Sequence, residues 1–97
     1  MSITKCITES RIQLGSNIKH QRKEQRLTQE QLGLMIGRDR SYISRIERGR
    51  CNATFDTIVL IAGGLGIPAS MLLEGVDELE ENTKPIPVHF SMPIYIA

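Results

Sequence analysis

Arginine is concentrated in one short stretch of the chain, GRDRSYISRIERGR, which runs from Gly37 to Arg50. Five arginines stand in these fourteen residues. A guanidinium is permanently charged, and its planar fork can donate two parallel hydrogen bonds to one anionic or carbonyl-bearing partner. Ile43 and Ile46 are three residues apart, which places them on one face of a helix and leaves the arginines on another. The stretch therefore favours binding of a polyanion.

Residue sets for catalysis or metal binding are not recognisable elsewhere. Cys6 and Cys51 are the two cysteines, and they form no CxxC or Cys/His cluster, which fits a reducing compartment without disulfides. His20 and His89 are far apart and lack the spacing of metal ligands. No Ser/His/Asp, Cys/His or paired-carboxylate arrangement is apparent. We expect no enzyme activity, no metal and no cofactor.

The charge of the chain is divided unevenly along its length. The net charge is +1, but residues 1 to 73 carry eleven Lys/Arg against six Asp/Glu, whereas residues 74 to 97 carry five acids and one Lys. A basic body beside an acidic extension suggests that the body meets a polyanion. The sequence shows neither a run of about 18 apolar residues nor a signal peptide, so a soluble, cytoplasmic protein is expected.

Capping signals predict two short helices around Gly37. Thr28 and Gln31 form a capping box that begins a helix over 29 to 36, and Gly37 ends it. Asp39 can cap the next helix, over about 40 to 48, which Gly49 closes. Two short helices joined in this way match a helix-turn-helix, whose second helix enters the DNA major groove.

Three further helices are predicted around this pair. Residues 9 to 26 form a basic amphipathic first helix, and Pro68 opens a short fifth helix through Leu73. Thr54 caps the remaining one, which is expected to be the most buried. Its apolar set is Phe55, Ile58, Ile61, Ala62 and Leu65. The fold class is all-α, with five helices.

The end of the chain has a different pattern. We divide the sequence into a domain over 1–75, an acidic linker over 76–84 and a tail over 85–97. The tail is apolar at six successive even positions, which is the period of a half-buried strand, although three prolines limit its pairing. A lone strand needs a partner, so we expect it to form an antiparallel ribbon with the same segment of a second copy.

The stretch from Ile18 to Leu73 resembles the lambda-repressor-like helix-turn-helix family, also called the Cro/CI or XRE type. The resemblance rests on LTQEQL, Gly37, YISRIERG and IAGGLGIP, in that order and spacing. The form RSYIS.IERG is also similar to the controller proteins of restriction-modification operons. Membership implies transcriptional regulation, by blocking or recruiting RNA polymerase.

The resemblance also implies roles for individual residues. Glu47 would pair with Arg22 and tie the recognition helix to the first helix. Tyr42 could contact the sugar-phosphate backbone or pack into the helix-turn-helix corner. The DNA-contacting set is Gln29, Arg38, Arg40, Ser41, Tyr42, Ser44, Arg45, Arg48 and Asn52, of which Arg40, Ser41, Ser44 and Arg45 would face bases.

One such domain reads few base pairs, so a homodimer on a two-fold symmetric operator is expected, with its recognition helices about 34 Å apart. The expected dimer interface consists of Leu65, Ile67, Met71, Leu72, Val88 and Phe90. Leu34, Met35 and Leu60 are apolar where the family is usually polar, and the tail is a candidate to cover them. The alternative is an antitoxin whose tail binds a toxin and which regulates its own operon.

Overall fold

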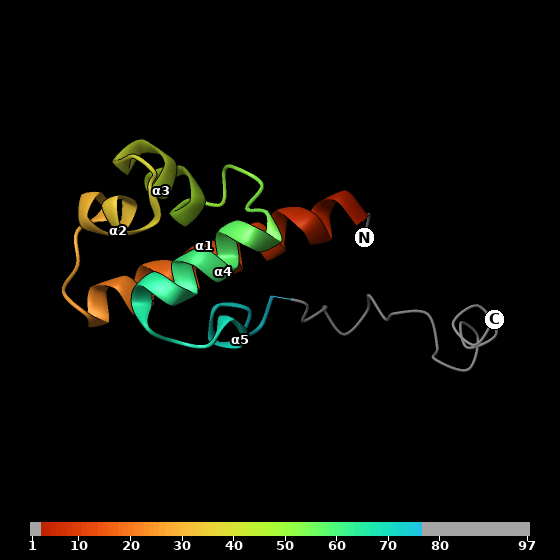
Figure 1. Ribbon diagram of the computed structural model, residues 1–97. Helices are drawn as coiled ribbons and strands as arrows, with labels where there is room; N and C mark the ends of the chain where they lie inside the picture. The colour runs from red at the N-terminus through yellow and green to blue at the C-terminus, as the bar shows by residue number, and fades with distance from the viewer. Residues whose placement is uncertain (1–2, 77–97) are drawn as a thin grey trace.

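The computed structural model describes residues 3–76, and within this range the chain is entirely helical (Figure 1). The five helices are α1 (Ile3–Glu24), α2 (Gln29–Ile36), α3 (Arg40–Glu47), α4 (Phe55–Leu65) and α5 (Ala69–Leu72). The all-α, five-helix fold expected from the sequence is therefore confirmed for these residues. The acidic linker over 76–84, apart from its first residue, and the strand-like tail over 85–97 lie outside the described residues, so their assignment stays a prediction.

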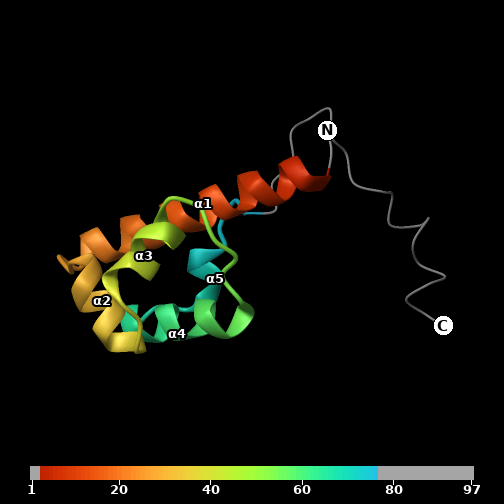
Figure 2. The ribbon, with the colours of Figure 1, turned by 90° about the horizontal axis from the view of Figure 1, so that it is seen from above.

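The helices enclose one core, with α1 along one side and α4 on the other (Figure 2). Each helix contributes one fully buried aliphatic side chain. These are Ile18, Leu32, Ile43, Ile61 and Leu72. Burial of such a side chain contributes roughly 1.5–3 kcal/mol. A single core shared by all five helices fixes how α2 and α3 stand relative to α1.

The first helix begins earlier and ends earlier than the predicted range of 9 to 26. It starts at Ile3, and no proline or glycine interrupts the residues before Ser10. The Ser10 hydroxyl donates to the Val76 carbonyl at 2.7 Å, which ties this extension to the chain after α5. At the other end, Arg26 adopts a left-handed conformation with φ 58°, so the helix stops at Glu24.

The caps of α2, α3 and α4 agree with the sequence. Thr28 Oγ1 accepts from the Gln31 amide at 3.0 Å, while Gln31 Oε1 accepts from the Thr28 amide at 2.8 Å. Asp39 Oδ1 accepts from the Tyr42 amide, and Thr54 Oγ1 accepts from the Thr57 amide. Each bond satisfies a backbone donor that has no partner in the first helical turn.

The expected inward face of α4 was wrong at its first residue. Phe55 is 75% exposed, whereas Thr57 is buried and lies on the same face as Ile61 and Leu65. The Thr57 hydroxyl accepts hydrogen bonds from the hydroxyls of Tyr42 and Thr54. A polar side chain with two such partners can be buried in the first turn, and Phe55 is thereby left on the solvent side.

None of the helices over residues 3–76 is long and apolar enough to cross a membrane.

Candidate nucleic-acid interface

The turn between α2 and α3 is built around two glycines. Gly37 has φ 74°, and the Arg38 amide donates to the Gly33 carbonyl at 2.8 Å, which closes the end of α2. A Cβ at Gly33 would lie 2.5 Å from the Arg38 carbonyl oxygen, so the backbone of the turn packs directly on α2. Only glycine allows this approach, and it sets the angle at which α3 leaves α2.

Helix α3 divides its side chains cleanly between core and solvent. Tyr42, Ile43, Ile46 and Glu47 are buried, and Ser44 is half-buried. The exposed positions are Arg40, Ser41 and Arg45, followed by Arg48 at the C-cap. A polar hollow on the surface runs along this face and is lined by Glu30, Asp39, Arg40, Ser41, Ser44 and Arg48. Arg40, Ser41, Ser44 and Arg48 therefore share one accessible face, and Arg45 is exposed but does not line the hollow.

The single acid within α3 is removed from that face by an ion pair. Arg22 Nε donates to Glu47 Oε2 at 2.6 Å, and Arg22 Nη2 donates to Oε1 at 3.0 Å. The side chains of Arg22 and Glu47 are 8% and 2% exposed. Arg22 also donates to the Leu27 carbonyl, and Gln29 Nε2 donates to Glu47 Oε1. The ion pair implied by the resemblance is present, and it joins α1 and α2 to α3.

Tyr42 packs into the corner of the helix-turn-helix. Its hydroxyl donates to Thr57 Oγ1 at 3.3 Å, and the residue is buried. The Arg38 guanidinium lies over the ring, 3.5 Å from its centroid, and that of Arg45 lies 5.8 Å away. A cation on an aromatic face is attracted by the ring quadrupole. The packing alternative for Tyr42 is thus realised, and the ring positions two exposed arginines.

Gln29 and Asn52 lie outside α3. Gln29 is the first residue of α2 and is half-buried, with its amide group engaged by Glu47. Asn52 is exposed in the segment between α3 and α4. Gln29 is joined to Glu47 of α3, whereas Asn52 lines an apolar pocket together with residues of α1 such as Arg11.

Two of the residues expected at the dimer interface are buried inside one protomer. Leu65 and Leu72 are 3% and 0% exposed within one protomer, because both fill the core. Their assignment to a surface is therefore corrected. Ile67 is half-buried and Met71 is exposed. The remaining two, Val88 and Phe90, lie outside the described residues.

Sequence reasoning missed the close crossing of α1 and α3. A Cβ at Gly15 would lie 2.3 Å from the Ile46 carbonyl oxygen and 2.7 Å from that of Glu47. This glycine lets the backbone of α1 approach the end of the recognition helix. The available signal was a glycine in the middle of a predicted helix, where it normally costs stability.

Comparison with known proteins also identifies a helix-turn-helix domain in this chain. A family model described as helix-turn-helix matches residues 18–72. The immunity repressor protein of Bacillus phage phi105 is 43% identical over 60 residues, which cover 62% of this chain and 42% of the repressor. The control protein C.MunI of Mycoplasma sp is 34% identical over 73 residues, which cover 74% of this chain and 99% of that protein.

A solved structure agrees with these relatives. The crystal structure of the restriction-modification controller protein C.AhdI from Aeromonas hydrophila superposes with a TM-score of 0.62 at 33% identity, covering 63% of this chain and 92% of that one. The chain spans less than half the length of the phage repressor and nearly all of C.MunI. The protein therefore belongs to the lambda-repressor-like, XRE-type helix-turn-helix family of DNA-binding transcriptional regulators.

Proposed function

We propose that this protein regulates transcription as a homodimer that binds a two-fold symmetric DNA operator through α3. The observation that carries the proposal is the division of charge on α3. Arg40, Arg45 and Arg48 are exposed, while Glu47, the one acid of the helix, is buried against Arg22. The outward face thus presents donors and positive charge to a polyanion.

The acids nearest to this face do not cancel its charge. Asp39 Oδ1 is engaged by the Tyr42 amide at the start of α3, where a carboxylate is favourable to the helix dipole. Glu30 lines the same polar hollow from α2. Four arginines are exposed on α3 or directly beside it, against these two acids, namely Arg38, Arg40, Arg45 and Arg48. The balance favours attraction to phosphate.

The contacts divide into those that specify sequence and those that position the protein. Arg40 and Ser41 stand in the first turn of α3, which is the part of a recognition helix that reaches base edges. Ser44 and Arg45 follow one turn later. A bidentate arginine can read guanine through its two major-groove acceptors.

The flanking residues serve as the positioning set. These are Gln29, Arg38, Arg48 and Asn52, which are proposed to contact the sugar-phosphate backbone. Such contacts fix register and carry no sequence information. The side-chain amide of Gln29 already donates to Glu47. The phosphate is therefore proposed to lie at the N-terminus of α2, beside Gln29.

A dimer is proposed because one α3 helix covers only a few base pairs. The interface is assigned to apolar residues of α4, α5 and the turn between them, with Met71 and the half-buried Ile67 retained from the sequence analysis and Val59 and Leu60 added. Val59, Leu60 and Met71 are exposed to solvent in one protomer. An isologous contact across a two-fold axis would cover them and set the spacing of the two α3 helices.

The test is selection of binding sites from random duplex DNA by the full-length protein, with sedimentation of the protein alone and with selected DNA. We expect inverted repeats whose half-site centres lie about 34 Å or a multiple apart, bound by two protomers. The logarithm of the binding constant should fall linearly with the logarithm of the salt concentration. Enrichment of asymmetric single sites, or binding by one protomer, would contradict the homodimer. Failure to enrich any sequence would contradict sequence-specific regulation.

The Leu60→Glu variant supplies a matched control for the dimer. It places a charge on the proposed interface and leaves α3 unchanged, so half-site recognition should persist while the dimer weakens. The control variant Lys19→Glu, at an exposed position of α1, should leave sedimentation unchanged. Equal effects of the two substitutions on sedimentation would refute the assigned interface.

A further inference from the structure

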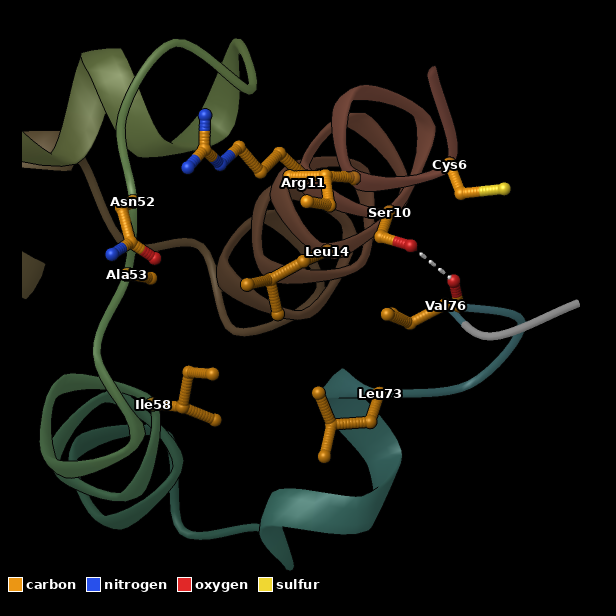
Figure 3. A pocket seen from close by; sticks show the side chains of 10 residues that line it. Cys6, Ser10, Arg11, Leu14, Asn52, Ala53, Ile58, Leu73 and Val76 are labelled. Carbon is orange, nitrogen blue, oxygen red and sulfur yellow. Dashed lines mark hydrogen bonds between the residues drawn. The ribbon is translucent and has the colours of Figure 1, made fainter. Parts of the chain in front are cut away.

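An apolar pocket, shown in Figure 3, is lined by residues of the first half of α1 and by none of α2. Its volume is about 420 Å³, which is within the range of cavities that hold ligands or inserted side chains. Ile7 and Leu14 line it from α1, Ile58 from α4, and Leu73 and Val76 from the end of α5 and beyond. Ile7 and Leu73 are partly exposed at its rim. Water in such a pocket would have few polar partners.

The described part of the chain ends at this pocket. Val76 is the last described residue and lines the cavity. Its carbonyl accepts from the Ser10 hydroxyl, and Asn17 Nδ2 donates to the carbonyls of Leu72 and Glu74 at 2.8 Å. These bonds hold the chain on α1 up to the rim. The next residues therefore start beside the opening.

The following sequence has the length and composition to fill the pocket. Residues 77–85 can span at most roughly 30 Å, which is enough to turn back across the opening. Residues 86–96 are apolar at every even position, so one side of an extended segment would be apolar. A short connection also gives the segment a millimolar effective concentration at the pocket, so even a weak affinity would keep it bound.

Charge at the rim is complementary to the connecting residues. Arg11 lines the pocket, and its Nε is buried without a hydrogen-bond partner among the described residues. Figure 3 shows its side chain extending from α1 towards the segment that holds Asn52. A buried N–H donor without an acceptor is costly, although the Arg11 side chain as a whole is only half-buried. Asp77, Glu78, Glu80 and Glu81 follow Val76 directly and supply carboxylates within reach.

We propose that part of the apolar face of residues 86–96, at Val88 and Phe90, occupies this pocket of its own chain, with the acidic residues 77–81 crossing beside Arg11. This location replaces the cover over Leu34 and Met35 considered from the sequence alone. Those two residues belong to α2, which follows the opposite end of α1 (Figure 1). The tail can reach the pocket without running along the domain to α2. The proposal is independent of DNA binding.

Cysteine pairing tests the position and the chain of origin. Cys6 is among the residues that line the pocket from α1, so it can report on the tail in a full-length Cys51→Ser background. Single variants Val88→Cys and Phe90→Cys are oxidised in parallel with His89→Cys and Ser91→Cys. Disulfides are identified by intact mass and peptide mapping. We expect an intrachain disulfide to Cys6 that forms several-fold faster from the even positions than from the odd ones.

Other outcomes of this oxidation overturn the proposal. Interchain disulfides to Cys6 would place the tail in the pocket of a second copy. Interchain disulfides between two tails would support the ribbon instead. Equal rates at even and odd positions, or no disulfide to Cys6, would show that no fixed face of the tail meets the pocket.

Stability of the full-length chain provides the second readout. Phe90→Ala should lower the folding equilibrium constant by a factor on the order of ten to a hundred, because it empties a buried aromatic site. Ser91→Ala, on the opposite face, should change it less than about threefold. Both effects should be independent of protein concentration. Equal effects of the two substitutions, or an effect of Phe90→Ala that vanishes on dilution, would refute occupation within one chain.

Discussion

Replacement of Glu47 by alanine should harm folding before it harms recognition of DNA. The Glu47 carboxylate accepts two hydrogen bonds from Arg22 and one from Gln29, and its side chain is 2% exposed. Without it, the Arg22 guanidinium keeps only the Leu27 carbonyl as an acceptor among the described residues. Removing one member of a buried ion pair costs about 3–5 kcal/mol, because the other charge stays buried.

That loss is large for a domain of this size. Small domains are stable by about 5–15 kcal/mol, and a change of about 1 kcal/mol moves the melting midpoint by about 4–8 °C. Glu47→Ala should therefore lower the midpoint by about 12 °C or more. Thermal and urea unfolding of the full-length chain without DNA measure the effect. Glu30→Ala, at an exposed position on α2, is the control and should stay within about 0.5 kcal/mol of the parent.

A double replacement separates loss of the pair from loss of its charges. Arg22→Met combined with Glu47→Leu leaves neither charge buried and keeps apolar volume at both positions, so most of the stability should return. The reasoning would be refuted if Glu47→Ala kept the parent midpoint and bound DNA more tightly. Glu47 would then act only by repelling phosphate.

Three further predictions concern the backbone, and all are measured by urea unfolding of the full-length chain. Gly15→Ala should cost about 1–3 kcal/mol, since its Cβ would meet the Ile46 carbonyl at 2.3 Å; parent-like stability would mean that α1 and α3 cross less closely. A Cβ at Gly63 would meet no atom within 4 Å, so Gly63→Ala should stabilise α4 by about 0.5–1 kcal/mol. A loss of stability would contradict the open surroundings of Gly63. Arg26→Gly relieves a left-handed φ and should be neutral or stabilising, whereas Lys23→Gly in α1 should cost about 1 kcal/mol; the reverse order would count against the end of α1 at Glu24.

Local chemistry made the central part of the fold predictable. Thr28 and Asp39 each satisfy backbone donors within three residues, so the starts of α2 and α3 could be read from the sequence. Gly37 marked the end of α2, because glycine readily adopts the left-handed φ of 74° that ends this helix. The arginine face of α3 followed from the spacing of Ile43 and Ile46.

Features that depend on packing between helices were harder to predict. Phe55, Ile58 and Leu65 recur at helical spacing, which predicts that they share one face of α4. Phe55 is nevertheless exposed, because Thr57 is buried in the first turn and bonds to Tyr42 of α3. Leu72 could equally have faced solvent or core in a four-residue helix. Its burial is decided by the helices around α5. Periodicity within one helix carries no information about which neighbours will cover it.

The most direct test of the central claim is the base preference of Arg40→Ala on the selected operator. Binding is measured on every single-base variant of the operator and over a range of salt concentrations, with Arg50→Ala, exposed beyond α3, as the control. We expect Arg40→Ala to lose preference at one symmetric pair of positions, at a cost of about 1–3 kcal/mol per lost bidentate contact, with the other preferences retained. Uniform weakening on all sequences, with a shallower salt dependence, would contradict base reading by Arg40 and make it a phosphate contact.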